Sequence, residues 1–248
     1  MSGRPFWVTA MLDLTADQHP AGQAFWSSVT GYDLSAVRGE SGEFATLIPG
    51  DGDPQLKVQR RCEGPSRLHL DLHVDDPDEA ADRAVELGAR VVVRHEFGYV
   101  VMTSPAGIPF CFVSHPAARR SPPARWGAEL SLVDQVCLDV PPSTYDAEWA
   151  FWEALTGWEG SPARLPQFRR VRGPDSQPIR FLVQRLDDEG PAGAHLDLAA
   201  TNRAAEVARH EALGAEVETV ADFWTVLRDP GGLRYCVTDR DPTTGAVG

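Results

Sequence analysis

The sequence predicts an α+β fold built from two tandem copies of one domain. The first observation is an internal repeat, because FWSSVTGYDL at 25–34 returns as FWEALTGWEG at 151–160, which is 126 positions later. The second is that HLDL at 69–72 recurs at 195–198 with the same offset. The third is that each copy alternates strand-like and helix-like patterns. Repeats that keep one order and nearly one spacing indicate a duplicated domain.

The two copies are joined by a segment without periodicity. SHPAARRSPPARWGAEL at 114–130 is rich in Pro, Ala and Arg, which is typical of a linker. The predicted organisation is domain 1 at 1–116, a linker at 117–130, domain 2 at 131–242 and a C-terminal tail at 243–248.

The first half of copy one predicts one strand, one helix and three further strands. A strand is expected at 7–14 and a helix at 20–30, with Pro20 in its first turn and Gly31 as its C-terminal cap. Gly, Asp and Pro turns then separate three short strands, expected at 32–37, 43–48 and 55–60.

The second half of copy one repeats this order. Leu alternates with His and Asp in RLHLDLH, which predicts a half-buried strand at 68–74 because successive side chains of a strand point to opposite faces. Asp76 is expected to cap a helix at 77–87. The remaining strands are expected at 90–94, 98–103 and 109–114. Each domain is therefore predicted to contain the order strand, helix and three strands twice.

Composition excludes several classes of function. A net charge of −13 disfavours nucleic acid and anionic membranes as partners. No apolar run approaches the roughly 20 residues that cross a bilayer, and the N-terminus lacks a signal-peptide hydrophobic region, so a cytoplasmic location is expected. The four cysteines form no CxxC pair, which indicates reduced thiols. The sequence also lacks GxSxG, GxxxxGK[ST], a GxGxxG after a strand, and HExxH.

Taken together, the paired strand-helix-three-strand units, FW…TG(Y/W) in the first helix, LGA after the second and (S/D)PxG before the last strand resemble the vicinal oxygen chelate superfamily. This group contains glyoxalases, bleomycin-resistance proteins and extradiol dioxygenases, and the match is closest to its glyoxalase-like domains. The resemblance implies that each domain joins two βαβββ units into a curved mixed sheet, with helices on the convex face and a ligand in the concave cup. The fold alone does not identify a reaction.

Metal-dependent members of this superfamily take ligands from the first, fifth and last strands. The resemblance places Thr9 and Gln135 at the first-strand position, His69 and His195 at the fifth, and Cys111 and Cys236 at the last, where a Glu is usual. Both copies therefore depart from the family pattern. The Gln135, His195 and Cys236 set could hold a divalent zinc, iron or manganese ion in domain 2.

The alternative is that neither domain holds a metal. In that interpretation Cys111 and Cys236 are small buried hydrophobic residues, and His69 and His195 hydrogen-bond to Asp71 and Asp197. Acidic cup residues such as Asp13 and Asp139 would add attraction for a cationic ligand. The complete set of predicted ligand-binding residues is His69, Asp71, His73, Tyr99, Cys111, Gln135, Asp139, Phe168, His195, Asp197, Trp224 and Cys236.

Two functions therefore remain open from the sequence. The first is metal-free binding of a small aromatic or natural-product-like ligand in the cups, with no cofactor. The second is a divalent-metal-dependent lyase, isomerase or dioxygenase-like activity of domain 2. A third possibility is that copy one has lost ligand binding and serves only to pair with copy two. The expected partner is a small molecule, and the chain is expected to be a monomer with intrachain domain pairing or a homodimer.

Overall fold

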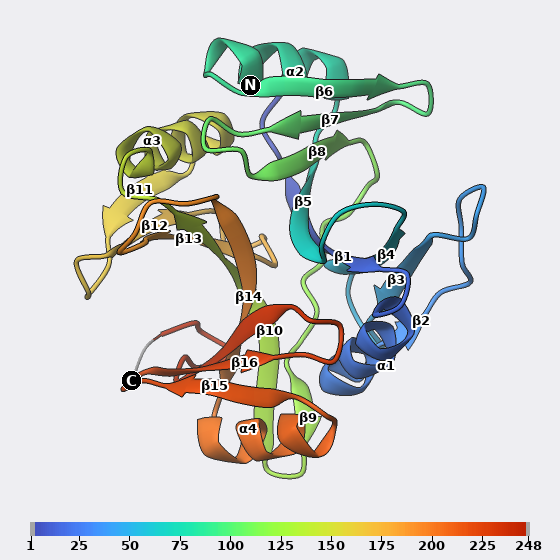
Figure 1. The fold of residues 1–248 in the computed structure, drawn as a ribbon, viewed down its shortest axis with the longest axis vertical. Coiled ribbons are helices and arrows are strands. Elements are labelled where there is room, and N and C mark those ends of the chain that lie inside the picture. Colours follow the sequence, from blue (N-terminus) through green and yellow to red (C-terminus); the bar gives the residue numbers. More distant parts are fainter. Residues whose placement is uncertain (1–2, 247–248) are drawn as a thin grey trace. The chain divides into compact units, whose positions relative to one another are not determined.

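The structure is a computed structural model that describes residues 3–246 and repeats the order strand, helix and three strands four times (Figure 1). Copy one contains β1 (Trp7–Thr15), α1 (His19–Thr30), β2 (Asp33–Leu34), β3 (Phe44–Ile48), β4 (Leu56–Arg61), β5 (Arg67–His73), α2 (Pro77–Glu86), β6 (Arg90–His95), β7 (Tyr99–Thr103) and β8 (Pro109–Val113). Copy two contains β10 (Glu129–Val140), α3 (Tyr145–Thr156), β11 (Glu159–Pro162), β12 (Phe168–Arg172), β13 (Arg180–Arg185), β14 (Gly193–Ala200), α4 (Arg203–Ala212), β15 (Glu216–Val220), β16 (Trp224–Arg228) and β17 (Arg234–Thr238).

Local sequence signals explain where the helices begin and end. The Asp76 carboxylate accepts hydrogen bonds from the backbone N–H groups of Asp78 and Glu79, which confirms the predicted cap of α2. Gly31 and Gly157 end α1 and α3 with φ values of 71° and 67°, in the left-handed region that glycine adopts without a steric penalty.

Two details differ from the prediction. The strand β2 is only two residues long, because Ser35 onward forms a turn-rich segment rather than a longer ladder. The segment predicted to be a linker contains a short strand, β9 (Ala124–Trp126), which pairs antiparallel with β10. The backbone N–H and C=O groups of this segment are satisfied by hydrogen bonds to β10. The segment has no alternation of apolar and polar residues, so the sequence pattern does not predict the strand.

The strands form two mixed sheets, which confirms the predicted α+β fold of two tandem sheet domains. Their orders are β2-β3-β4-β1-β5-β8-β7-β6 and β11-β12-β13-β10-β14-β17-β16-β15. The pairs β5 with β8 and β14 with β17 are parallel, and the other registered pairs in the described residues are antiparallel. The parallel register places Asp71 opposite Cys111 and Asp197 opposite Cys236.

The chain divides into two compact units that do not coincide with the two sequence copies. Unit 1 consists of Met1–Ala10, Leu68–Arg119 and Val136–Ala194. Unit 2 consists of Met11–Arg67, Arg120–Gln135 and His195–Gly248. Each unit therefore joins one βαβββ module of copy one to one module of copy two.

An aromatic core fills each unit. In unit 1, the rings of Phe151 and Trp152 on α3 lie 6.0 and 5.4 Å from that of Phe110 on β8. In unit 2, the rings of Phe25 and Trp26 on α1 lie 5.8 and 5.2 Å from that of Tyr235 on β17. Trp26 and Trp152 are fully buried, as their spacing on the helices predicts.

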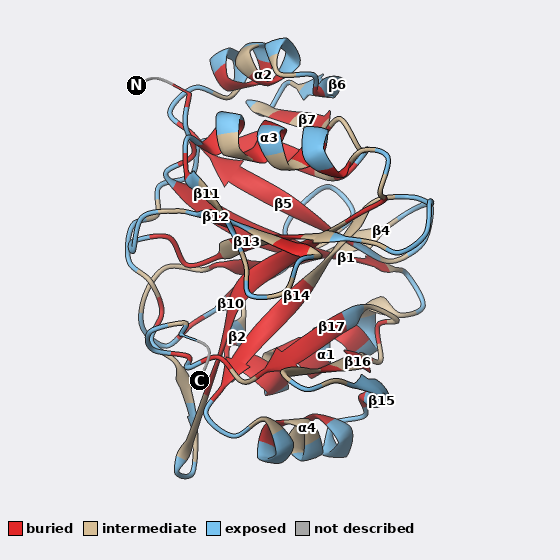
Figure 2. Cartoon of the chain, turned by 90° about the vertical axis from the view of Figure 1, so that its left-hand side faces the viewer, coloured by how far each residue is buried: buried red, intermediate tan, exposed pale blue. Residues whose placement is uncertain are grey.

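The strand β5 is buried on both faces, so the prediction of a half-buried strand was wrong (Figure 2). Leu70 and Leu72 are fully buried, but His69, Asp71 and His73 are also only 7%, 3% and 3% exposed. These polar side chains can be buried because His69 pairs with Asp71 and His73 hydrogen-bonds to Thr9. Alternation therefore identified the two faces correctly but not the environment of the polar face.

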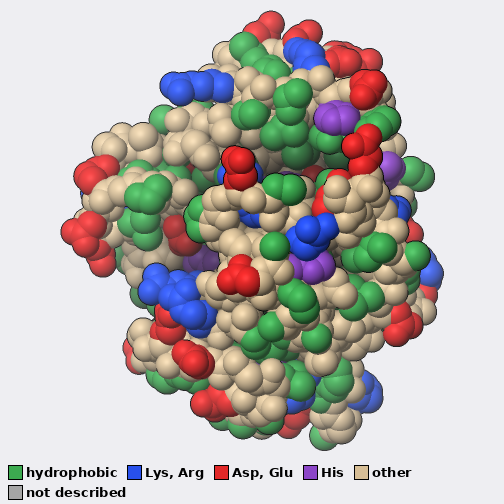
Figure 3. Space-filling view, turned by 45° about the vertical axis from the view of Figure 1, so that its right-hand side comes forward, with side chains coloured by type: hydrophobic (Ala, Val, Ile, Leu, Met, Phe, Trp, Pro, Cys, Tyr) green, Lys and Arg blue, Asp and Glu red, His purple; other side chains and the backbone are tan. Residues whose placement is uncertain are grey.

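On the face drawn in Figure 3, acidic and basic side chains are interspersed with hydrophobic ones. Among residues 3–246, none of the helices has the length and apolar character needed to span a bilayer.

Candidate functional site

Unit 1 gathers three potential ligand atoms on the polar faces of β5 and β8. One atom each from His69, Asp71 and Cys111 lies within 4.8 Å of the others, and all three residues are buried. His69 Nε2 is 3.4 Å from Asp71 Oδ1, which fits the predicted interaction of this histidine with its neighbouring carboxylate. The parallel register of β5 and β8 brings Asp71 and Cys111 together, because opposed residues project to the same face.

The first-strand position of copy one has a different partner. Thr9 Oγ1 lies 2.9 Å from His73 Nε2, and His73 Nδ1 lies 2.7 Å from the carbonyl oxygen of His115. Because a carbonyl only accepts, Nδ1 carries the proton, and the Thr9 hydroxyl therefore donates to Nε2. The hydroxyl is thus bound to His73, and Thr9 is fully buried.

Unit 2 gathers the equivalent residues of copy two. One atom each from His195, Asp197 and Cys236 lies within 4.8 Å of the others. His195 Nε2 is 3.4 Å from Asp197 Oδ1, and 15% of the His195 side chain is exposed. Gln135, which the sequence placed among the metal ligands, instead directs its amide Nε2 at Asp197 Oδ2 over 2.5 Å.

The Asp197 carboxylate of unit 2 has three polar neighbours of its own. Besides Gln135 and His195, Arg240 Nη1 lies 3.7 Å from Asp197 Oδ2, and the same guanidinium is hydrogen-bonded to the buried Asp134. Burial alone would raise the pKa of Asp197, but the hydrogen bond and charge of His195, the charge of Arg240 and the Gln135 amide outweigh it and lower the pKa. Asp197 is therefore held as a carboxylate by protein groups.

Both clusters have donor groups that fit a divalent metal. In unit 1, the His69 nitrogen, Asp71 oxygen and Cys111 sulfur form a mixed donor set of the kind that zinc accepts. In unit 2, a cation near Asp197 would share the carboxylate with Gln135 and lie close to the positively charged Arg240. Both clusters offer a nitrogen, an oxygen and a sulfur donor that a divalent metal accepts, and in unit 2 Gln135 and Arg240 also contact the carboxylate.

The remaining predicted residues are divided between the units. Tyr99 lies in unit 1, and its ring stacks on that of His95 at 4.5 Å. Asp139 and Phe168 also belong to unit 1, and Asp139 Oδ1 lies 3.9 Å from Cys137 Sγ. Trp224 begins β16 in unit 2 and is half-buried.

Asp13 does not offer an unopposed negative charge to a cationic ligand. Its Oδ2 lies 3.1 Å from Arg61 Nη1 and 3.2 Å from Arg67 Nε, so the sequence-based expectation was wrong for this residue. The prediction also missed Asp134 and Arg240. Arg240 follows the last strand, where the sequence has no periodicity to mark it, and only the fold brings it to Asp197.

Comparison with known proteins identifies the domain type in both copies. The family described as glyoxalase-like domain matches residues 9–113 and again residues 135–238. A search of curated proteins found no match.

Several solved structures share the fold over nearly the whole chain. A mutant of 4-hydroxymandelate synthase from Streptomyces coelicolor is 16% identical, with 100% of this chain and 96% of that chain covered and a TM-score of 0.62. The Mn(II)-bound glyoxalase from Novosphingobium aromaticivorans is 16% identical, with 99% and 86% covered and a TM-score of 0.64. The 2,2',3-trihydroxybiphenyl 1,2-dioxygenase from Sphingomonas wittichii is 14% identical, with 96% and 90% covered and a TM-score of 0.61. These likenesses confirm the resemblance to the vicinal oxygen chelate fold.

Proposed function

The chain belongs to the glyoxalase-like domain family, and from that premise we propose that it binds a small aromatic, natural-product-like ligand in its cup-shaped pockets without a metal. The single observation that carries this proposal is the environment of Asp197. Its carboxylate already accepts a hydrogen bond from Gln135, lies beside His195 and is close to Arg240. A divalent cation would have to compete with all three groups for the same oxygens.

In this proposal the cluster orients a histidine toward the ligand. Asp197 lies at the Nε2 side of His195 and holds the orientation of the ring. A hydroxyl or carbonyl oxygen on an aromatic ring is a suitable partner for an imidazole nitrogen. The neighbours named above include a trihydroxybiphenyl dioxygenase, which supports hydroxylated aromatic compounds as the first probes.

The test is titration of chelator-treated protein with hydroxylated aromatic compounds such as catechol and hydroxybiphenyls. Isothermal calorimetry is expected to detect binding by the wild-type chain, and His195→Ala is expected to weaken it about tenfold or more. His69→Ala is the matched control, because it removes the equivalent histidine of copy one. Binding that appears only after a divalent metal is restored, or that is lost in His69→Ala alone, contradicts the proposal.

A second candidate function is favoured by the cluster in unit 1. His69, Asp71 and Cys111 are buried, close together and chemically suited to a divalent ion, so a metal-dependent lyase, isomerase or dioxygenase-like activity would use this cluster. A bound ion would act as a Lewis acid on neighbouring substrate oxygens. His69 and Cys111 would hold it, and Asp71 would either bind it or orient His69. The sequence had instead placed this activity in domain 2.

Elemental analysis of protein purified without a His-tag separates the two candidates. The metal-dependent candidate predicts about one metal ion per chain, retained in Cys236→Ser and lost in Cys111→Ser. The metal-free proposal predicts no stoichiometric metal in any of the three proteins. Metal retained in Cys111→Ser but lost in Cys236→Ser would contradict both assignments, because it would place the ion in unit 2.

A further inference from the structure

Each compact unit contains one buried carboxylate that accepts the indole N–H of a helix tryptophan. In unit 1, Glu148 Oε1 accepts from Trp152 Nε1 at 2.7 Å, and its Oε2 accepts from the backbone N–H of Ala106 at 2.8 Å. In unit 2, Asp229 Oδ2 accepts from Trp26 Nε1 at 2.5 Å, and its Oδ1 accepts from the backbone N–H of Leu233 at 2.8 Å. The exposed fractions are 0% for Glu148 and 3% for Asp229.

The two carboxylates belong to equivalent contacts between a helix and a turn, but one lies on the helix and the other in the turn. Glu148 lies on the helix α3, and its repeat equivalent on α1, 126 positions earlier, is Gly22. Asp229 lies in the turn between β16 and β17, and its equivalent between β7 and β8, 125 positions earlier, is Ser104. Each helix–turn contact therefore holds a single carboxylate, supplied by the helix in unit 1 and by the turn in unit 2.

The packing around Gly22 explains why α1 carries no acid at this position. A Cβ atom on Gly22 would lie 2.6 Å from Leu14 Cδ1 and 3.2 Å from the Cα of Gly231. These approaches are closer than van der Waals contact, so unit 2 has no room for a helix side chain where unit 1 has Glu148.

In both units the helix and the turn come from different copies of the repeat. The helix α3 of copy two contacts the copy-one turn at 104–107, and the helix α1 of copy one contacts the copy-two turn at 229–232. We propose that these single carboxylates form a pairing code, which makes the first helix of each copy pack only against the last turn of the other copy.

The reason for the code is seen when each first helix is placed against the last turn of its own copy. The helix of copy two against its own turn would bury Glu148 beside Asp229, and two close carboxylates cannot both be ionised without a large penalty. The helix of copy one against its own turn would face Ser104, so the Trp26 indole would have no carboxylate acceptor. The exchanged pairing avoids both defects.

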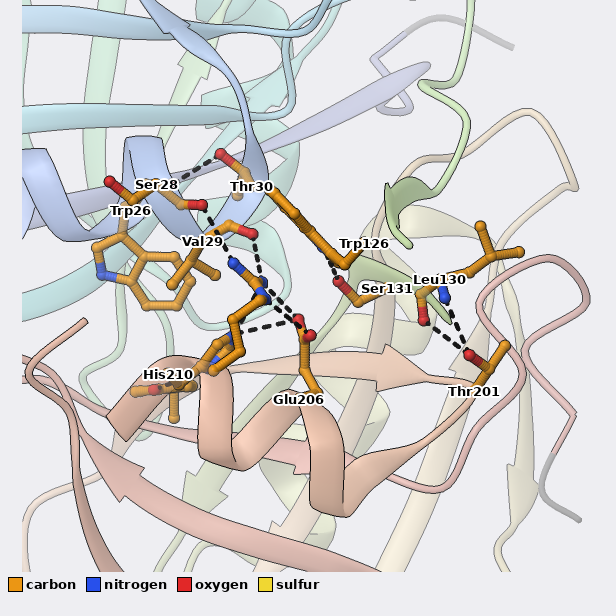
Figure 4. Close-up of polar contacts among 12 residues, drawn as sticks. Trp26, Ser28, Val29, Thr30, Trp126, Leu130, Ser131, Thr201, Glu206 and His210 are labelled. Atoms are coloured by element: carbon orange, nitrogen blue, oxygen red, sulfur yellow. Dashed lines mark hydrogen bonds and ion pairs between the residues drawn. The ribbon is translucent and has the colours of Figure 1, made fainter. Parts of the chain in front are cut away.

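A second pair of contacts holds the exchanged modules but does not distinguish the copies. Arg209 on α4 donates to the carbonyl oxygens of Ser28 and Val29 at the C-terminal end of α1, at 3.2 and 2.8 Å (Figure 4). Its repeat equivalent, Arg83 on α2, donates to the carbonyl oxygens of Ala154 and Leu155 at the end of α3. Because both copies carry this arginine, the discrimination depends on the carboxylates.

The test introduces a second carboxylate into unit 1 of the full-length chain. Ser104→Asp places an acid beside Glu148, and Ser104→Asn is the matched control of similar size without charge. At about pH 8, Ser104→Asp is expected to lower the melting temperature at least about 5 °C below that of Ser104→Asn. In the Glu148→Ala background this difference is expected to shrink, because the introduced acid would then be the single carboxylate of the contact, as Asp229 is in unit 2.

The possible outcomes either support or overturn the pairing code. Equal stability of the Asp and Asn variants with Glu148 present overturns it, and so does a double variant that loses the sum of the two single losses. Failure of Ser104→Asp to fold supports the code when the double variant folds, and contradicts it when only Ser104→Asn folds. If no Ser104 variant folds, Glu148→Ala and Asp229→Ser decide, because each removes the only carboxylate of a contact. Unchanged melting temperatures in both then overturn the proposal.

Discussion

Asp229 is expected to make unit 2 less stable as pH rises, and Asp229→Asn tests this directly. Burial raises the pKa of Asp229 from 3.8 to about 6, although the N–H groups of Leu233, Trp26 and Gly231 and the charge of Arg228 act in the opposite direction. The folded-state pKa exceeds the unfolded value, so the native state binds the proton more tightly. The stabilisation is therefore complete below about pH 4 and is lost as pH rises through about 6.

The magnitude follows from the difference between the two pKa values. The change from 3.8 to about 6 is roughly two pKa units, which corresponds to about 3 kcal/mol at 1.36 kcal/mol per unit. Asparagine at 229 carries no charge but keeps an oxygen that can accept one of the two hydrogen bonds. We expect the loss of the other bond to cost about 1 kcal/mol at acidic pH.

Urea denaturation of wild-type and Asp229→Asn protein between about pH 4 and pH 7.5 measures this contribution. The free energy of unfolding of the wild type minus that of the variant isolates residue 229, because distant titrating groups cancel in the difference. We expect this difference to fall by about 3 kcal/mol over the range, so that the variant becomes the more stable protein at neutral pH. A difference that stays constant or rises with pH would refute the account of Asp229 as a buried, charge-destabilised group.

Three further predictions concern the contacts around α1 and α4. Arg209→Ala should lower the free energy of unfolding by about 3 kcal/mol in urea denaturation, because it leaves the buried Glu206 without the 2.7 Å ion pair to Arg209. A loss as small as that of an exposed arginine variant contradicts this prediction. Burial alone would raise the pKa of Glu206, but the hydrogen bonds of His210 and Arg209 outweigh it and lower the pKa from 4.5 to about 2. The wild type should therefore lose its stability advantage over Glu206→Gln as pH falls from 4.5 toward 2. A difference in the free energy of unfolding that is independent of pH in acid titration argues against this prediction. Gly31→Ala should cost more than Gly127→Ala in thermal unfolding, since both glycines have positive φ but only a Cβ on Gly31 would approach Trp126, at 3.2 Å; equal losses would show that the contact is unimportant.

Most of the element order could be predicted from the sequence, because it depends on local chemistry. The alternation in RLHLDLH, the Asp76 cap and the Gly31 terminus are all read from neighbouring residues, and the structure confirms each element that they mark. The repeat offset then transfers the same elements to copy two. The short strand β9 was missed because the sequence around Ala124–Trp126 has no pattern, and it forms through its pairing with β10.

The candidate site could be predicted only in part. The resemblance to the vicinal oxygen chelate superfamily singled out His69, His195, Cys111 and Cys236, and the structure brings each histidine close to its cysteine. It could not show that the Gln135 amide binds a carboxylate. That interaction depends on the registry of β10, β14 and β17, which are distant in sequence.

The sequence by itself determined the duplication, the α+β class and the positions of the two polar clusters, since repeats and periodicity are properties of the linear chain. Only the tertiary structure decided that each compact unit takes its modules from both copies. The physical reason is visible in the carboxylates of Glu148 and Asp229. Each is tolerated in the interior only where a tryptophan N–H and a backbone N–H meet it. One donor in each unit comes from a segment far away in the sequence, namely the Ala106 N–H for Glu148 and the Trp26 indole for Asp229.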